Sequence, residues 1–311
     1  MNTFLTVKSR DLKIAGWLLR IARLDGEGYL FIDDPEGIVE GLRDRGKRVD
    51  IFTFTQRLSD RAPKYRYHME WDNFAALSIS SFDEWWTKQI GFKARNKAKQ
   101  AEKHGVTLCE VPYNEDLVSG ICEIYNETPI RQGKRFPHYG MTLDQIRRYA
   151  GTFLDRSVFI AAYLDAKLIG FIKLTIDETG TQAGLMHILS LVSQRDKSPT
   201  NALLAQAVRC CADRNIKHLV YSQFSYGNKQ FDSLSDFKER NAFQKVDIPR
   251  YYVPLTPVGV IALRLGLHRR LIDAVPESVM AKFRELRKIW YSRDKFRGQR
   301  PSPELGRDGL A

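Results

Sequence analysis

Between Ser193 and Val208 the chain reads SQRDKSPTNALLAQAV, a segment that follows an apolar run and opens a helical pattern. Ser198 is a typical N-cap residue and Pro199 suits the first helical position, so a strand is expected to lead directly into a helix. The N-terminus of a helix favours anions, and Arg195 and Lys197 add positive charge. The segment therefore predicts a phosphate site, although it lacks the glycine that most phosphate-binding turns use. The alternative is a surface loop with two ordinary charges.

The segments on either side of this turn follow a readable order of strands and helices. From residue 105 to residue 256 the pattern predicts a strand, two helices, three strands, the helix that begins at Pro199, a strand, a short helix and a final strand. Hairpin-length connections make the three consecutive strands antiparallel, and the crossover helix makes the next pair parallel. We therefore expect an α/β fold with a mixed, mostly antiparallel sheet flanked by helices.

Two further parts are predicted around this core. Residues 1–104 are expected to form an N-terminal α/β extension that includes one helix from about Phe82 to His104. Residues 257–311 are expected to form a basic helical tail, with an apolar stripe from Val279 to Trp290 flanked by Lys and Arg. Such a helix suits an anionic membrane surface, and docking on the core is an equal alternative.

The composition restricts the classes of function. Hydrophobic residues make up 43% of the 311 residues, and no apolar run is long enough for a membrane span. The N-terminus has no signal-peptide pattern, and the 4 Cys and 6 His residues show no disulfide or metal-ligand spacing. We therefore expect a cytoplasmic protein without a metal. A G-x-S-x-G motif is missing from the sequence, which argues against a Ser-His-Asp hydrolase.

The formal net charge of +12 indicates anionic partners such as nucleotides, nucleic acids, phospholipids or phosphorylated substrates. The surplus gathers in the tail and in the segment KARNKAKQAEK, from Lys93 to Lys103. A solvated helix face is the simpler explanation for both clusters.

The predicted order of elements resembles the GNAT acyltransferase fold. The segment AAYLDAKLIGFIKL is similar to the family's second and third strands, and FKERNAF is similar to its F-Y-E-K-L-G-F motif. The turn aligns with the family's pyrophosphate loop, R-x-x-G-x-G/A, with Arg195 in the first position and Ser198 and Thr200 where the glycines stand. The missing glycines should hinder a pyrophosphate from settling on the backbone.

Other segments are more similar to the Fem-type branch of this superfamily, in which the acyl donor is aminoacyl-tRNA. They are SPTNALL and the long basic helix ending in KARNKAKQAEKHGV. The segments NETPIRQGKRFPHYG, RDKSPTNALL and PRYYVPLT resemble a GNAT-like group associated with bacterial exopolysaccharide or cell-envelope clusters. Within this resemblance, residues 1–104 are either a vestigial second copy or an accessory cap.

The resemblance implies a set of site residues. The acyl carrier would be held by the backbone at the end of the fourth family strand and by the turn that follows, at Leu191, Val192, Ser193, Arg195, Lys197, Ser198, Thr200 and Asn201. Lys238 replaces the Tyr that usually protonates the leaving group, and would stabilise charge in the transition state unless it is a solvated surface residue. His187 would act as a base unless it is a satisfied core residue. A loop beside the cleft would bind the acceptor through Arg131, Gln132, His138 and Tyr139.

These features together predict an acyltransferase. The expected donor is acyl-CoA, most simply acetyl-CoA, and the expected acceptor is an amine or hydroxyl on an anionic saccharide or nucleotide-sugar-like precursor of the cell envelope or an exopolysaccharide. Aminoacyl-tRNA is the alternative donor; it is disfavoured because its users usually carry two complete acyltransferase domains and residues 1–104 look too short for one. A non-catalytic module that binds nucleic acid or a membrane is the alternative from another class. The expected location is the cytoplasm, with a peripheral contact at the inner face of the membrane as one possibility.

Overall fold

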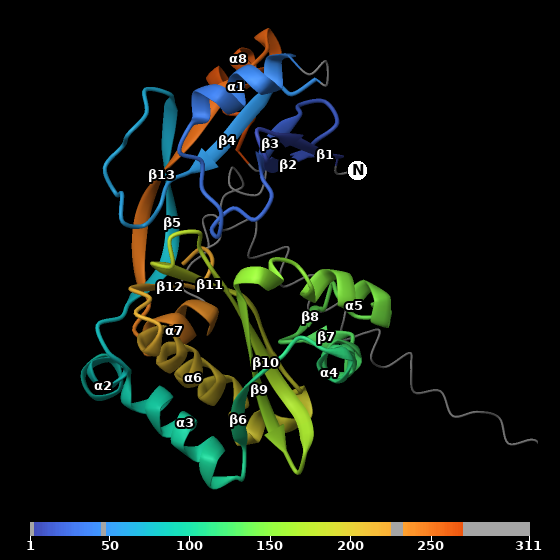
Figure 1. Ribbon diagram of the computed structural model, residues 1–311, viewed down its shortest axis with the longest axis vertical. Coiled ribbons are helices and arrows are strands. Elements are labelled where there is room, and N and C mark those ends of the chain that lie inside the picture. The colour runs from blue at the N-terminus through green and yellow to red at the C-terminus, as the bar shows by residue number, and fades with distance from the viewer. Residues whose placement is uncertain (1–2, 45–47, 225–232, 270–311) are drawn as a thin grey trace, which may run out of the picture. The chain divides into compact units, whose positions relative to one another are not determined.

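The computed structural model describes residues 3–44, 48–224 and 233–269 (Figure 1). Its main sheet contains β1 (Thr3–Val7), β2 (Arg10–Ala15), β3 (Ile21–Leu24), β4 (Ile51–Thr55), β5 (His68–Ser78), β6 (Thr107–Val111), β9 (Ser157–Leu164), β10 (Lys167–Ile176), β11 (Gln182–Ser190), β12 (His218–Val220) and β13 (Gln244–Pro254). A separate small hairpin is formed by β7 (Ile130–Arg131) and β8 (Lys134–Arg135).

The helices are α1 (Pro35–Asp44), α2 (Phe82–Glu84), α3 (Phe92–Lys103), α4 (Glu115–Asn126), α5 (Leu143–Ala150), α6 (Pro199–Asp213), α7 (Ser233–Arg240) and α8 (Pro257–Arg264). Shorter turns are the π-helical η1 (Trp85–Gln89) and the 3-10 segments η2 (Leu154–Arg156) and η3 (Val192–Lys197). Within the described ranges, no helix is long and apolar enough to cross a bilayer. The predicted stripe from Val279 to Trp290 lies outside the described residues.

The strands of the main sheet lie in the order β1-β2-β3-β4-β13-β5-β12-β11-β10-β9-β6. Neighbouring strands are antiparallel except for the pairs β3–β4 and β11–β12, which are parallel. The predicted fold class, a mostly antiparallel GNAT-type sheet flanked by helices, is therefore confirmed. The late strand β13 pairs with β4 on one side and with β5 on the other, which joins the N-terminal strands to the rest of the sheet.

Two hydrophobic clusters support the two ends of this sheet. The larger one includes Ile121 of α4, Phe171 of β10 and Leu203 of α6, all of them fully buried. Figure 1 shows α4 and α6 on opposite sides of β10, and both helices contact this strand. The second cluster packs α1 against β2 and β4, with Ile38 and Phe52 among its buried side chains. Residues 1–104 thus contribute most of this second core, which Tyr251 and Val253 of β13 complete.

The helix predicted from Phe82 to His104 is interrupted. The segment begins as α2 and η1, and α3 starts only after Gly91. Gly91 donates its N–H to the carbonyl of Arg240 at 2.8 Å, and a Cβ atom at Gly91 would lie 3.0 Å from that carbonyl oxygen. A tertiary contact with the end of α7 therefore determines where α3 begins.

Candidate acyl-carrier site

A cavity of about 580 Å³ lies where the end of β11 meets the start of α6. Residues from β11, η3, α6, α3, α7 and the β7–β8 hairpin line it. Of the residues that the sequence predicted for the site, the cavity brings together Arg131, Gln132, Leu191, Val192, Arg195, Ser198, Thr200 and Asn201. The predicted residues Ser193, Lys197, His138, Tyr139, His187 and Lys238 are outside this lining.

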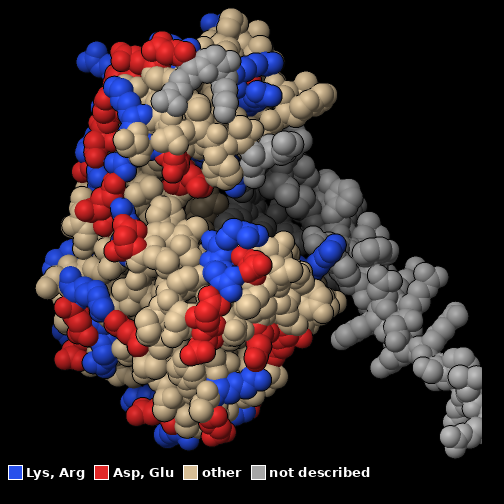
Figure 2. Space-filling view, turned by 45° about the vertical axis from the view of Figure 1, so that its right-hand side comes forward, with Lys and Arg blue, Asp and Glu red and all other residues tan. Residues whose placement is uncertain are grey.

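The described lining is strongly basic. Its cations are Lys93, Lys97, Arg131, Arg195 and Arg240, and its one acidic residue is Asp236. Asp236 pairs with Arg240 at 2.8 Å, so the remaining cations have no acidic neighbour in the lining. On the outer face shown in Figure 2, by contrast, Lys and Arg are mixed with Asp and Glu. The cavity therefore suits an anionic ligand better than that outer face does.

The two lysines from α3 reach the cavity because of the helical period. Ala94, Ala98 and Ala101 are buried and pack α3 against α6. Lys93 and Lys97 stand one turn apart and both line the cavity, while their backbone is held by the alanine stripe. The segment KARNKAKQAEK is thus more than a solvated face, because it contributes two cations to the cavity wall.

The turn between β11 and α6 has an unusual backbone. Ser198 has φ +56°, in the left-handed region where glycine is favoured, and it occupies a glycine position of the pattern that the sequence resembles. Its N–H donates to the carbonyl of Arg195 at 3.0 Å, and the N–H of Asn201 donates to the carbonyl of Ser198 at 3.1 Å. The hydroxyls of Thr200 and Ser190 lie 2.9 Å apart. The turn keeps a glycine-like conformation without glycine.

A carboxylate that the sequence analysis missed occupies the end of β11. Glu127, the C-cap residue of α4, accepts the N–H groups of Val192 at 2.5 Å and Ser193 at 2.8 Å. Burial raises the pKa of Glu127, but these N–H groups and Arg131 more than offset it, so the net pKa is lowered. The two donors expected to polarise an acyl carbonyl are therefore already bonded to an ionised side chain.

Arg131 supports this arrangement. Its guanidinium lies 3.4 Å from the Glu127 carboxylate and donates to the carbonyls of Ser190 at 2.7 Å and of Ile124. Its side chain is only 12% exposed. The sequence carried no clear signal for this pair, because α4 ends at Asn126 and Arg131 lies on β7, so the helical i,i+4 rule does not predict their contact.

Lys238 lies directly behind the cavity wall. Its side chain is fully buried, so the solvated alternative does not describe it. Its Nζ donates to the carbonyl of Gln223 and lies 4.9 Å from the ring centroid of Tyr221, which lines the cavity. The buried ammonium therefore places positive charge directly behind an aromatic part of the cavity wall.

His187 lies on β11 but faces a cluster of aromatic rings. Its ring centroid is 4.8 Å from that of Tyr149, and its buried Nε2 has no hydrogen-bond partner within the described residues. Burial, with the nearby charge of Lys173, lowers the pKa of His187 to about 4. The imidazole is therefore neutral and weakly basic at pH 7.

The remaining predicted residues are spread around this region. His138 packs against the ring of Tyr149, with centroids 5.0 Å apart, whereas Tyr139 is 47% exposed. Lys197 pairs with Asp196 at 3.4 Å. The residues predicted to bind the acceptor are thus divided: Arg131 and Gln132 line the cavity, whereas His138 and Tyr139 do not.

Comparison with known proteins finds similar solved structures but no similar sequence. No protein-family model and no curated protein sequence matches the chain. Among solved structures, the C-terminal domain of a protein assigned as a lysylphosphatidylglycerol synthetase from Agrobacterium fabrum is similar, with 14% identity over 85% of this chain and 87% of that chain and a TM-score of 0.55. FemX is similar with 9% identity over 80% of this chain and 87% of that chain and a TM-score of 0.56. L-PGS from Bacillus licheniformis is similar with 13% identity over 86% of this chain and 90% of that chain and a TM-score of 0.54.

At such low identities these comparisons establish the fold, which is GNAT-like and of the kind found in FemX. Residues 105–256 are about half of the chain, so a match over 85% of it extends well into the N-terminal strands. These folds therefore include a counterpart of at least part of residues 1–104. The resemblance to an exopolysaccharide-associated group stays a prediction.

Proposed function

We propose that the protein is an acyltransferase whose acyl carrier is held by its phosphate groups in the basic cavity. The observation that carries this proposal is that Lys93, Lys97 and Arg195 line one cavity with the start of α6. Side-chain cations and a helix N-terminus together favour anions such as phosphate. The GNAT-like, Fem-like fold supports a transferase of this class.

Acyl-CoA is the carrier we propose first, with an amine or hydroxyl of a cell-envelope or exopolysaccharide precursor as the acceptor. The turn keeps the length and charge of the resembled pyrophosphate loop, and a cavity of about 580 Å³ is within the usual range for cofactor sites. In the reaction the acceptor nitrogen or oxygen attacks the acyl carbonyl, a C–N or C–O bond forms, the C–S bond breaks, and the acceptor proton is passed on to solvent or the departing thiolate. Lys238 would offset the negative charge that develops on the carbonyl oxygen.

Aminoacyl-tRNA is a second candidate carrier, and one observation favours it. Glu127 already occupies the N–H groups of Val192 and Ser193, so a carrier bound by side-chain cations alone fits the cavity without displacing it. The lysines of α3 supply such cations for a nucleic-acid backbone. The objection to this carrier was that residues 1–104 are too short for a second acyltransferase domain. The similarity to FemX over 80% of the chain weakens that objection.

Calorimetric titration with acetyl-CoA and with aminoacylated tRNA tests the proposal. Arg195→Ala removes a cation from the cavity, and Lys197→Ala is the matched control, because Lys197 lies outside the lining and pairs with Asp196. Binding of acetyl-CoA that is lost in Arg195→Ala and kept in Lys197→Ala would support acyl-CoA as the donor.

The other outcomes are equally informative. Absence of heat with acetyl-CoA, together with tRNA binding that needs Arg195, would move the assignment to aminoacyl-tRNA. Salt-dependent binding of any nucleic acid, without acyl transfer from either carrier, would replace the enzyme by a non-catalytic binding module.

A further inference from the structure

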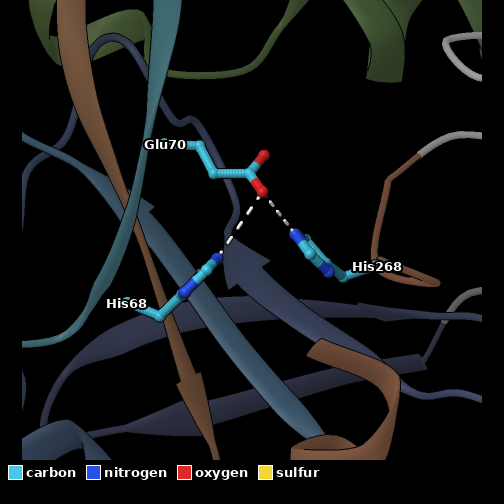
Figure 3. A group of neighbouring side chains, drawn as sticks. All are labelled: His68, Glu70 and His268. Atoms are coloured by element: carbon cyan, nitrogen blue, oxygen red, sulfur yellow. Dashed lines mark hydrogen bonds and ion pairs between the residues drawn. The ribbon is translucent and has the colours of Figure 1, made fainter. Parts of the chain in front are cut away.

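Three potential metal ligands meet beside β5, and none of them lines the cavity at the start of α6. His68 and Glu70 stand two residues apart on β5, which places their side chains on one face of the strand. His268 follows α8 and approaches the same face (Figure 3). The sequence separates His268 from the other two by about 200 residues, so a search for local ligand spacing could not detect the group.

The three ligand atoms converge on one point. Oε1 of Glu70 lies 2.9 Å from Nε2 of His268 and 3.5 Å from Nε2 of His68, and Figure 3 shows both rings turned toward that oxygen. All three ligand atoms lie within 4.8 Å of one another. A single ion placed between them would need only small side-chain rotations to reach bonding distance of about 2.0–2.2 Å.

The two histidines of the group differ in their exposure to solvent, which would give an ion both a path of entry and a buried ligand. The side chain of His268 is 1% exposed, and its Nδ1 has no hydrogen-bond partner among the described residues. The side chain of His68 is 46% exposed, so the group is open to solvent on that side. An ion that enters from solvent would therefore meet the exposed His68 first and the buried His268 behind it.

The surrounding charges allow a cation. Arg269 also contacts Oε1 of Glu70, at 2.9 Å, but its side chain is 61% exposed and the carboxylate has a second oxygen to which it can shift. The nearby Arg250 is already paired with Glu27 at 2.9 Å and Asp72 at 2.8 Å. These three carboxylates outnumber the two arginines, which leaves a local negative balance when both histidines are neutral.

We propose that His68, Glu70 and His268 bind one divalent transition-metal ion, for which two imidazoles and one carboxylate are a common ligand set. The ion ties the segment after α8 to β5, so its role is to hold these two parts of the chain together. This site is independent of the proposed acyl transfer.

The test uses the full chain, freed of metal with a chelator and titrated with ZnCl₂ by calorimetry. The wild type should bind one equivalent. His68→Ala removes an accessible ligand without disturbing the core and should weaken binding by about 100-fold or more. His104→Ala, at an exposed histidine after α3, is the matched control and should bind as the wild type does. Co²⁺ substitution should give a visible spectrum without a thiolate charge-transfer band, because Cys109 and Cys122 are not ligands.

Arg269→Ala separates a metal site from a simple ion-pair network. Removal of the guanidinium leaves Glu70 free for the ion, so zinc affinity should be kept or raised. Zinc should also raise the melting temperature of the wild type and of Arg269→Ala, but not that of His68→Ala. Absence of stoichiometric zinc binding, or equal binding by wild type and His68→Ala, would overturn the proposal and leave the group as an ion-pair network around Glu70.

Discussion

Glu127→Gln tests the contact between Glu127 and the N–H groups of Val192 and Ser193, which the sequence did not predict. The carboxylate accepts two backbone N–H groups, at 2.5 and 2.8 Å, and its side chain is 18% exposed. A hydrogen bond to a charged group contributes about 1.5–3 kcal/mol. The amide of Gln can accept only one of the two N–H groups and turns its own NH₂ toward the other, so the free energy of unfolding should fall by about 2–4 kcal/mol.

The assay is urea unfolding at pH 7, with Glu123→Gln as the control. Glu123 lies on the same helix, is 63% exposed and pairs with Lys167 at 3.5 Å, so its substitution should change stability by less than about 0.5 kcal/mol. The pKa of Glu127 is lowered in the folded state, so its contribution is present above the unfolded value near 4.5 and is lost as the pH falls through the folded value. The gap between wild type and Glu127→Gln should therefore narrow in acid. Equal losses in the two variants would refute the reasoning.

The same residue distinguishes the two carriers. Glu127→Ala exposes the N–H groups of Val192 and Ser193 to solvent. An acyl-CoA whose carbonyl uses these donors should bind more tightly to this variant, whereas a carrier held by side-chain cations alone should bind with unchanged affinity. Weaker binding of both carriers would show instead that Glu127 mainly keeps the cavity in shape.

Three more perturbations address other buried charges. Burial lowers the pKa of Lys173 to about 8, so the unfolded state binds more protons above that pH, and the free energy of unfolding should rise by up to about 1.4 kcal/mol per unit from pH 8 to 9.5. Urea unfolding of Lys173→Met should lack this rise. Arg250→Ala leaves Glu27 and Asp72 buried without their shared partner and should cost about 3–5 kcal/mol in the same assay, and a loss below 1 kcal/mol would contradict the ion-pair geometry. Lys238→Met should keep carrier binding and slow single-turnover acyl transfer about 100-fold; an unchanged rate would remove Lys238 from the mechanism.

The fold was predictable wherever local signals agree with the tertiary structure. The two-residue connection at Asp165 and Ala166 predicted a hairpin, and both residues take the left-handed backbone of a tight turn between β9 and β10. The break at Gly91 was not predictable, because the contact that ends the helical run comes from Arg240, about 150 residues later. The pairing of β13 with both β4 and β5 is similarly remote from any local pattern.

The site residues likewise include some that local sequence predicts and others that only the tertiary structure brings together. The start of α6 was found from sequence because Ser198, a proline and two cations stand together in a few residues. The expected direct passage from strand to helix was wrong, because η3 lies between β11 and α6, and the side chain of Ser198 makes no capping hydrogen bond. The burial of Lys238 was not found, because a helix as short as α7 carries too few turns for its apolar stripe to identify the inward face. The group of His68, Glu70 and His268 depends on β5 meeting a segment from the other end of the chain, which no spacing rule contains.

Glu127 shows why a motif can locate a site and still leave its chemistry open. The residues from Leu191 to Asn201 determine that a strand ends and a helix begins, and these constraints are local. Whether the freed N–H groups at Val192 and Ser193 bind a ligand depends on a side chain 65 residues earlier, which reaches them only because α4 packs against β10. An ionised carboxylate repels phosphate, so under the proposed function the phosphates of a carrier would be bound by side chains such as Lys93, Lys97 and Arg195 and not by the N–H groups of Val192 and Ser193. The local sequence predicts the turn, but the contact between Glu127 and this turn decides which of its groups are free to bind an anion.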